Sequence, residues 1–80
     1  MSVSKLSTLQ PGEYATIQGI SGDEVLHQRL LALGFRVGKE VRLIRRGRFK
    51  GPLQIRIGTT DVIMRRADAD QIRVSAPTAQ

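Results

Sequence analysis

The chain has 80 residues, of which 40% are apolar. It carries a net charge of +6 and contains no cysteine. A chain of this length forms one small domain and buries only about 60% of the surface that its unfolded form exposes. These figures exclude disulfides, thiolate metal sites and thiol nucleophiles, and they favour a binding module over an enzyme with a deep active site.

No stretch of the sequence is suited to crossing a membrane. The longest apolar run, residues 30–33, is far shorter than the roughly 20 residues that a spanning helix needs. The first residues also lack the basic segment and apolar stretch of a secretory signal. We therefore expect a soluble cytoplasmic protein that is not inserted in a membrane.

The first predicted elements are a turn and a strand. Pro11-Gly12 is a dipeptide typical of turns. In residues 14–20, the apolar side chains of Ala15 and Ile17 alternate with polar ones, which predicts a strand with one buried face.

A helix follows this strand, and both of its ends are marked. Ser21 is a favoured N-cap, and Glu24 three residues later completes a capping box. Gly34 suits the left-handed residue that ends a helix, and Phe35 after it can pack back on Leu30, as in a Schellman motif. At 100° per residue, the predicted buried stripe consists of Leu26, Leu30 and Leu33.

The other side of this helix offers a candidate contact residue. Leu31 is predicted to point away from the core, among polar neighbours that include His27 and Glu24. An exposed leucine can anchor a small interface, although single exposed leucines are also ordinary on protein surfaces. Leu31 and the neighbouring His27 are therefore candidate partner-binding residues.

The second half of the chain predicts short strands joined by turns. A hairpin turn is expected at residues 58–61, and one turn of helix at residues 67–70. We expect strands at residues 41–44, 53–57, 62–65 and 72–74. Short strands at this spacing, with one inserted helix, predict a mostly β fold in the form of a small, partly open barrel.

The positive charge is concentrated in the middle of the chain. Residues 36–56 contain eight basic residues and one acidic residue, whereas the segments on either side are close to neutral. This predicts a positive face that attracts an acidic protein surface, a membrane headgroup layer or nucleic acid. The alternative is a solvated face that keeps a small protein in solution.

Four motifs follow one another along the chain. Residues 29–38 read arginine-leucine-x-x-leucine-glycine-x-x-x-glycine, and residues 51–55 begin with glycine-proline. Residues 62–69 combine a strand, arginines and a short turn, and residues 6–12 read leucine-x-x-leucine-x-x-glycine. Each motif alone is common, but their order and spacing are specific. On these motifs the chain resembles the ferrous iron transport accessory protein A (FeoA) family over residues 5–74.

The resemblance implies an SH3-like barrel of about five short strands with one α-helix inserted after the first strand. We expect a single domain of this type over residues 1–74, in which Gly34 and Gly38 support the fold. The small, polar residues 75–80 are expected to form a flexible tail.

The resemblance also implies a partner, the inner-membrane ferrous iron transporter of FeoB type, which has a GTP-binding domain on its cytoplasmic side. We expect a cytoplasmic accessory protein that is recruited to the inner membrane and modulates this transporter. The direction of the effect, the transporter surface and the oligomeric state stay open. The same module is similar to the C-terminal domain of iron- or manganese-dependent repressors, but the sequence shows no helix-turn-helix motif before it, so we expect the free-standing transport accessory. The expected partner-binding residues are Leu31, His27, Arg45, Arg46, Arg48, Phe49 and Lys50.

Catalysis has little support in the sequence. His27 is the only histidine, no motif places a nucleophile beside it, and the phosphate-binding loop of GTPases is absent. We therefore expect neither an enzyme nor a resident cofactor. His27 follows Asp23 and Glu24 by four and three residues, so these three side chains could hold a divalent ion weakly. A zinc or iron site would need further ligands, and the plainer interpretation is a surface histidine.

Nucleic acid is the alternative from another class of function. The basic segment would give binding with a steep salt dependence. A single-strand platform needs several stacking rings, and we expect Tyr14 and Phe35 to point inward, which leaves Phe49 alone. We therefore expect no nucleic acid partner.

Overall fold

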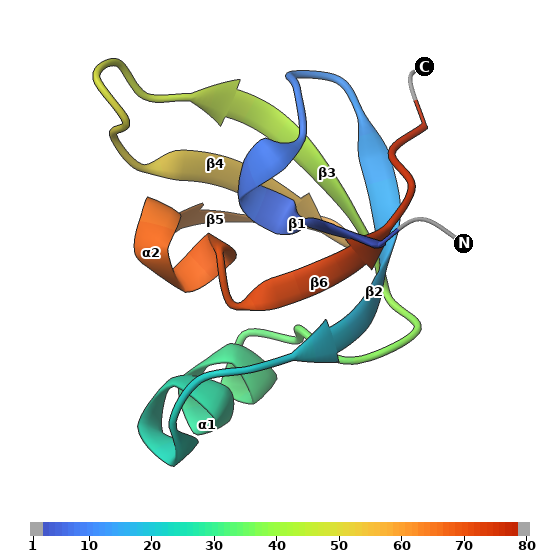
Figure 1. The fold of residues 1–80 in the computed structure, drawn as a ribbon, viewed down its shortest axis with the longest axis vertical. Helices are drawn as coiled ribbons and strands as arrows, with labels where there is room; N and C mark the ends of the chain where they lie inside the picture. Colours follow the sequence, from blue (N-terminus) through green and yellow to red (C-terminus); the bar gives the residue numbers. More distant parts are fainter. Residues whose placement is uncertain (1–2, 79–80) are drawn as a thin grey trace.

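The β-strands of the chain form one continuous antiparallel sheet. The computed structural model describes residues 3–78 (Figure 1). In chain order its elements are β1 (Val3–Lys5), the 3-10 helix η1 (Leu6–Thr8), β2 (Tyr14–Ile20), α1 (Glu24–Ala32), β3 (Glu40–Arg46), β4 (Leu53–Ile57), β5 (Thr60–Met64), α2 (Arg66–Ala69) and β6 (Ile72–Ser75). The strand order is β1-β6-β2-β3-β4-β5.

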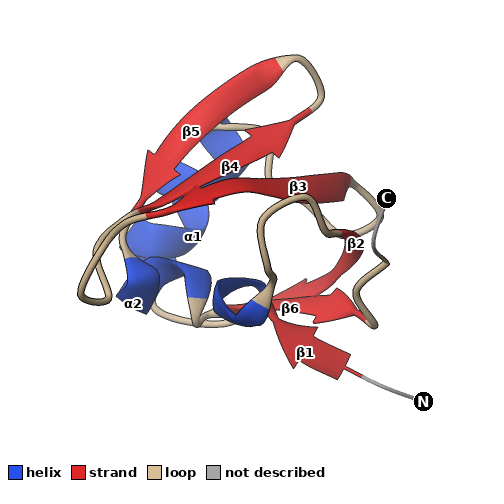
Figure 2. Cartoon of the chain, turned by 90° about the horizontal axis from the view of Figure 1, so that it is seen from above, coloured by secondary structure: helices blue, strands red, loops and turns tan. Residues whose placement is uncertain are grey.

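β2 connects two layers of this sheet. Its first residues pair with β3, and its last residues pair with β6 after a shift in register. The sheet therefore folds over at β2, with β3, β4 and β5 in one layer and β1 and β6 in the other (Figure 2). This arrangement confirms the prediction of a mostly β, barrel-like fold.

The structure adds one strand, β1, before the predicted first strand at residues 14–20. The described residues contain six strands rather than about five, because Val3–Lys5 pairs with β6 along the edge of the sheet. As a result, α1 follows the second strand and not the first. The three residues of β1 have no apolar alternation that could have predicted a strand.

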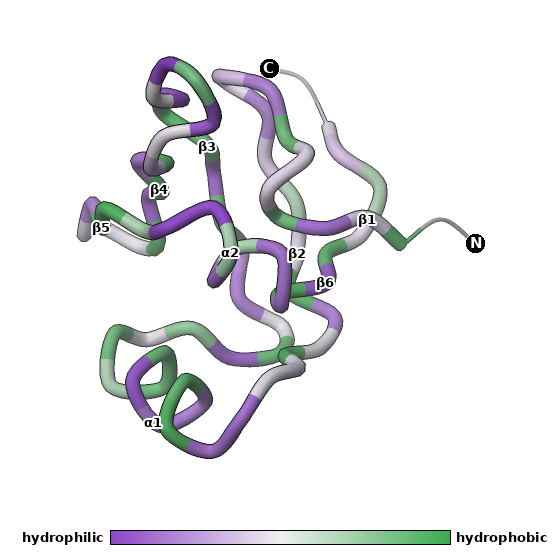
Figure 3. The backbone as a smooth tube through the Cα atoms, turned by 60° about the vertical axis from the view of Figure 1, so that its left-hand side comes forward, coloured by the Kyte–Doolittle hydropathy of each residue, from purple (hydrophilic) through white to green (hydrophobic). Residues whose placement is uncertain are grey.

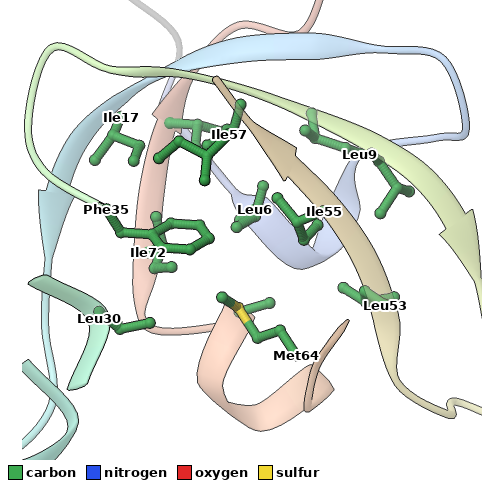
Figure 4. Close-up of a cluster of buried hydrophobic side chains, with 14 of the residues drawn as sticks. Leu6, Leu9, Ile17, Leu30, Phe35, Leu53, Ile55, Ile57, Met64 and Ile72 are labelled. Atoms are coloured by element: carbon green, nitrogen blue, oxygen red, sulfur yellow. The ribbon is translucent and has the colours of Figure 1, made fainter. Parts of the chain in front are cut away.

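The hydrophobic core lies between the two layers (Figure 4). The inward positions of β2, β3, β4 and β6 supply most of it, as the alternation in the sequence predicts. Leu6 and Leu9, at the two ends of the η1 turn, are fully buried and close one end of the barrel. The labelled core side chains are Leu6, Leu9, Ile17, Leu30, Phe35, Leu53, Ile55, Ile57, Met64 and Ile72.

The start of α1 differs from the prediction. Its N-cap is Asp23, whose carboxylate accepts a hydrogen bond from the amide of Leu26 at 2.9 Å. Ser21, the predicted N-cap, lies two residues too early, and its hydroxyl oxygen accepts a hydrogen bond from the guanidinium of Arg73 instead. Both residue types are favoured caps, so local sequence does not distinguish them.

The end of α1 is as predicted. The amide of Gly34 donates to the carbonyl of Leu31 at 3.0 Å, and the amide of Phe35 donates to the carbonyl of Leu30 at 2.9 Å. These two bonds define a Schellman motif, and Gly34 has the left-handed φ of +98° that the motif requires. Gly38, in the turn that follows, also has a positive φ. No helix in residues 3–78 is long and apolar enough to cross a bilayer.

The C-terminal segment is paired further than we expected. Ser75 ends β6, and Thr78 exchanges two backbone hydrogen bonds with Tyr14, at 2.9 and 2.8 Å. Paired structure therefore extends past residue 74, where the flexible tail was expected to begin. Residues 79–80 lie outside the described residues.

Candidate interaction surfaces

The β3–β4 hairpin ends in a tight turn built from a charged residue and an aromatic one. The amide of Gly51 donates to the carbonyl of Arg48 at 2.9 Å, and the two residues between them, Phe49 and Lys50, have φ of +53° and +60°. Positive φ at both central positions defines a type I′ turn, which asparagine and glycine normally occupy. The turn projects from the molecule (Figure 1), and the Phe49 side chain is 98% exposed.

A β-bulge in β3 decides which arginines of this hairpin point outward. The register of β3 against β4 shifts between Leu43 and Arg45, which makes Ile44 the extra residue. Because side chains alternate along a strand, Arg45 would otherwise share the inward face of Leu43. The bulge turns Arg45 outward and places Arg46 on the inward side.

Arg46 is engaged inside the molecule. Its Nη1 atom donates to the backbone carbonyls of Ser7 and Leu9, at 2.8 and 2.7 Å. These hydrogen bonds fasten η1 to the base of the hairpin. We expected Arg46 to contact a partner, but its guanidinium holds the barrel end together instead.

The outward face of β3 and β4 is positive, as the charge distribution predicts. Arg42 lies opposite Arg56 across the two strands, and Arg45 follows on the same face. The positive surface continues to Arg48 and Lys50, which are exposed at the turn. In Figure 3 the outer end of the hairpin is coloured hydrophilic except for a short hydrophobic band. We call the exposed cations Arg45, Arg48 and Lys50, together with Phe49, the hairpin tip.

One ion pair on β4 and β5 perturbs a titrating group. Arg56 donates from Nε and a terminal nitrogen to the two carboxylate oxygens of Asp61, at 2.7 and 3.1 Å. These hydrogen bonds lower the pKa of Asp61 below its ordinary value, and a bond from Gln54 adds to the effect. The same pair raises the pKa of Arg56, mainly through the side-chain hydrogen bond.

A groove of about 190 Å³ lies between α1 and the edge strand β5. Leu33 and Ile63 are exposed beside it, by 41% and 68% of their surface. Arg29 and Asp68 also border it and form an ion pair at 3.7 Å. The lining residues are Arg29, Leu30, Leu33, Val62, Ile63, Met64, Arg65 and Asp68.

The apolar surface of α1 differs from the prediction at two positions. Leu33, predicted to be buried, is exposed because it is the C-cap, where the chain leaves the helix. Leu31, predicted to be exposed, is half-buried, as is His27. The predicted contact residues do not include Ile63, although strict alternation with inward-facing Met64 would assign Ile63 to the outer face of β5.

Comparison with known proteins agrees with this architecture. Residues 4–76 match the FeoA domain family. The chain belongs to this family. It is 34% identical over 70 residues to an Fe(2+) transport protein A/Fe(2+) transporter FeoB fusion protein of Porphyromonas gingivalis. The match covers 88% of the chain but only 8% of the fusion protein, so the FeoA domain is a small part of that relative.

Two solved FeoA structures share the fold. Iron(II) transport protein A from Clostridium thermocellum is 32% identical, with a TM-score of 0.84, over 89% of this chain and 44% of that one. A zinc complex of FeoA from Stenotrophomonas maltophilia, an SH3 domain protein, is 26% identical, with a TM-score of 0.83, over 95% and 96% of the two chains. The family and the SH3-like fold that the motifs predict are therefore confirmed.

The predicted weak metal ligands do not gather into a site. The carboxylate of Asp23 caps α1, and that of Glu24 accepts a hydrogen bond from Gln28 at 2.7 Å. His27 is half-buried on the same helix. Within residues 3–78, no three histidine or acidic side chains come together in a way that could hold a metal ion.

Proposed function

We propose that this FeoA-domain chain is a non-enzymatic, cytoplasmic accessory protein that docks on a FeoB-type ferrous iron transporter and modulates its activity. The observation that carries the proposal is the P. gingivalis fusion protein, in which a homologous segment is part of the same chain as such a transporter. The S. maltophilia relative, a candidate activating factor for bacterial ferrous iron transport, supports it further.

Fusion supports a working contact between the two parts. A covalent link raises the effective concentration of one module at the other to roughly the millimolar range. A FeoA domain without such a link would have to reach the same surface by its own affinity, so its docking face would have to bind more tightly than that of a fused domain. Two faces of this chain are candidates, the α1–β5 groove and the hairpin tip.

The α1–β5 groove is the better candidate for the main contact. Leu33 and Ile63 expose apolar surface on either side of it, and the exposed β5 edge lies next to them. Apolar anchors beside a groove supply most of the affinity in small interfaces. Leu33 and Ile63 take the place of Leu31 in this proposal, because Leu31 is half-buried and Leu33 and Ile63 are more exposed.

The hairpin tip contributes long-range attraction. Arg45, Arg48 and Lys50 are exposed, and the chain has no acidic residue from Val41 to Thr60. Such a charge accelerates encounter with an acidic cytoplasmic surface and loses its effect as salt rises. Docking then modulates the transporter if the FeoA domain binds one of its conformations more tightly than another.

The first test is capture of the detergent-solubilised, full-length transporter by the tagged protein. We expect capture by the unmodified chain, and at least a tenfold loss with Leu33→Glu or Ile63→Glu. Val3→Glu on β1 is the matched control, since Val3 is also exposed, by 55%, but lies on the opposite edge of the sheet. All variants are first compared by circular dichroism and thermal unfolding.

The outcomes separate docking from the alternatives. Absence of capture by the unmodified chain at low and at moderate salt would contradict the proposal. If Ile63→Glu and Val3→Glu capture equal amounts of transporter, the transporter is still the partner, but the α1–β5 groove is not the docking face. Modulation is measured as the GTPase rate of the transporter with and without the protein. A gel-shift assay with an unrelated oligonucleotide tests the nucleic acid alternative on the same preparation.

A further inference from the structure

The turn of the β3–β4 hairpin has an arrangement that the fold does not need. Phe49 contributes nothing to the core, since its side chain is 98% exposed. Both Phe49 and Lys50 are held in the left-handed region, which is unfavourable for residues with a Cβ. Strained backbone at an exposed position is a common feature of binding sites. The conformation keeps an aromatic ring at the outermost point of a rigid hairpin.

The hairpin around this turn is built to keep its shape. The amide of Gly47 donates to the carbonyl of Pro52 at 2.8 Å, one step outside the turn. A Cβ on Gly47 would lie 2.8 Å from the same carbonyl oxygen, so glycine allows the two strands to approach closely here. At the base, Arg46 fastens the hairpin to η1. The aromatic ring is therefore presented on a well-supported arm.

Cationic residues flank Phe49 on both sides in the sequence. Arg48 and Lys50 flank it in the turn, and Arg45 lies on the outward face of β3 behind it. The nearest acidic residues in the sequence, Glu40 and Asp61, lie at the other end of the sheet, and Asp61 is already paired with Arg56. The tip therefore combines one large apolar group with three exposed positive charges.

We propose that the hairpin tip binds an anionic lipid bilayer, with Phe49 inserted at the level of the headgroups. Aromatic rings are favoured in this interfacial region, and nearby Lys or Arg side chains are attracted to anionic lipids. An aromatic ring can insert into a bilayer without a preformed pocket. Anionic headgroups are mobile, so the cations beside the ring need no particular spacing. Stacking on nucleic acid would call for several rings, whereas Tyr14 is half-buried and Phe35 fully buried.

This inference goes beyond docking on a transporter and does not depend on it. A lipid-bound tip would hold the chain at a membrane surface, where a membrane-embedded partner is available. Each contact alone is weak, because one aromatic ring and three charges give reversible binding only. Lipid and protein contacts would therefore reinforce each other through the effective concentration of the second site.

The test is binding of the full chain to large unilamellar vesicles. One set contains phosphatidylcholine and phosphatidylglycerol at a ratio of 3:1, and the control set contains phosphatidylcholine alone. We expect sedimentation with the anionic set only, weakening as salt rises. Phe49→Ala is expected to reduce the partition coefficient on the order of tenfold. Arg48→Gln and Lys50→Gln are expected to reduce it about fivefold each.

Matched variants control for general loss of charge or apolar surface. Lys5→Gln removes an exposed charge from β1, in the other layer of the sheet, and Val25→Ala removes an exposed apolar side chain from α1. Both are expected to leave vesicle binding within about twofold of the unmodified chain. Because the chain has no tryptophan, Phe49→Trp also creates a single tryptophan reporter at the tip. Its emission is expected to shift to the blue with anionic vesicles.

Three results would overturn the inference. The first is an unshifted Phe49→Trp emission at lipid concentrations that sediment the protein. The second is an unchanged partition coefficient for Phe49→Ala, which would indicate charge attraction without insertion. The third is binding of an oligonucleotide, or of an acidic protein domain, that depends on Phe49 while vesicle binding is absent. Transporter capture is measured separately with Leu33→Glu, so failure of one proposal does not imply failure of the other.

Discussion

The two hairpin turns on either side of β4 solve the same geometric problem with different residues. Between β4 and β5, two residues connect Ile57 to Thr60, and the positive φ of +61° falls on Gly58. Between β3 and β4, positive φ falls on Phe49 and Lys50. Both turns follow the twist of the sheet, but only the first uses the residue type that adopts it without strain. The contrast is what the proposed contact role of the β3–β4 turn predicts, whereas the β4–β5 turn has the residue that the fold alone would favour.

The two turns also differ in how their hairpins are anchored. Arg56 and Asp61 join β4 to β5 through an exposed ion pair, which solvent and salt weaken. Arg46 joins the base of the other hairpin to the buried η1 segment through two hydrogen bonds to backbone carbonyls. Three predictions test the difference, from the largest expected effect to the smallest.

Arg46→Ala is expected to have the largest effect. It removes two charge-assisted hydrogen bonds and leaves the carbonyls of Ser7 and Leu9 without this donor, so we expect a loss of about 3 kcal/mol in the free energy of unfolding. Urea denaturation measures it. Arg45→Ala is the matched control and should change stability by less than about 0.5 kcal/mol, because Arg45 is exposed. Similar losses for the two variants would contradict the role of the bulge at Ile44.

The turns themselves should respond in opposite directions to substitution. Phe49→Asn combined with Lys50→Gly supplies the residues that a type I′ turn favours, so we expect a gain of about 1 to 2 kcal/mol. Gly58→Ala places a Cβ at positive φ and should cost about 1 kcal/mol. Thermal unfolding of both variants measures the two changes in stability. If Phe49→Asn combined with Lys50→Gly does not raise the stability, the backbone of Phe49 and Lys50 is not strained.

Acid should weaken the β4–β5 hairpin slightly. The pKa of Asp61 is lowered in the folded chain, so the Asp61 contribution is fully present above the ordinary carboxyl pKa and is lost as the pH falls through the lowered value. Asp61→Asn should remove this part of the pH dependence below pH 4 or so. An NMR titration of the Asp61 carboxyl measures the pKa directly. A normal pKa would mean that the pair with Arg56 does not persist in solution.

Most of the fold follows from local patterns. Alternation in residues 14–20 and 53–57 predicts two strands with the bounds that the structure shows, and Gly34 marks the end of α1 correctly. The prediction fails where two local solutions are equally good. Ser21 and Asp23 are both favoured N-caps, and only the course of the chain into α1 selects Asp23.

The interaction surfaces were harder to predict, for a different reason. An extra residue such as Ile44 shifts the alternation without a sequence signal, so Arg45 and Arg46 lie on the opposite faces from those that strict alternation would give them. Leu33 fits a buried stripe by angle, but the helix ends before it. Ile63 gains importance only from the position of β5 at the edge of the sheet. Such features depend on pairing between distant segments, which local sequence does not encode.

The two ends of the described chain lie close together in the fold. Val3 pairs with Ser75, and Thr78 pairs with Tyr14. Figures 1 and 2 place both ends on the side of the molecule away from the β3–β4 hairpin. A linker attached at either end would therefore leave the hairpin tip accessible. The domain could then present the tip to a surface while it is covalently joined to another polypeptide. The same geometry lets the domain be joined to a larger protein, or labelled for imaging, without covering the hairpin.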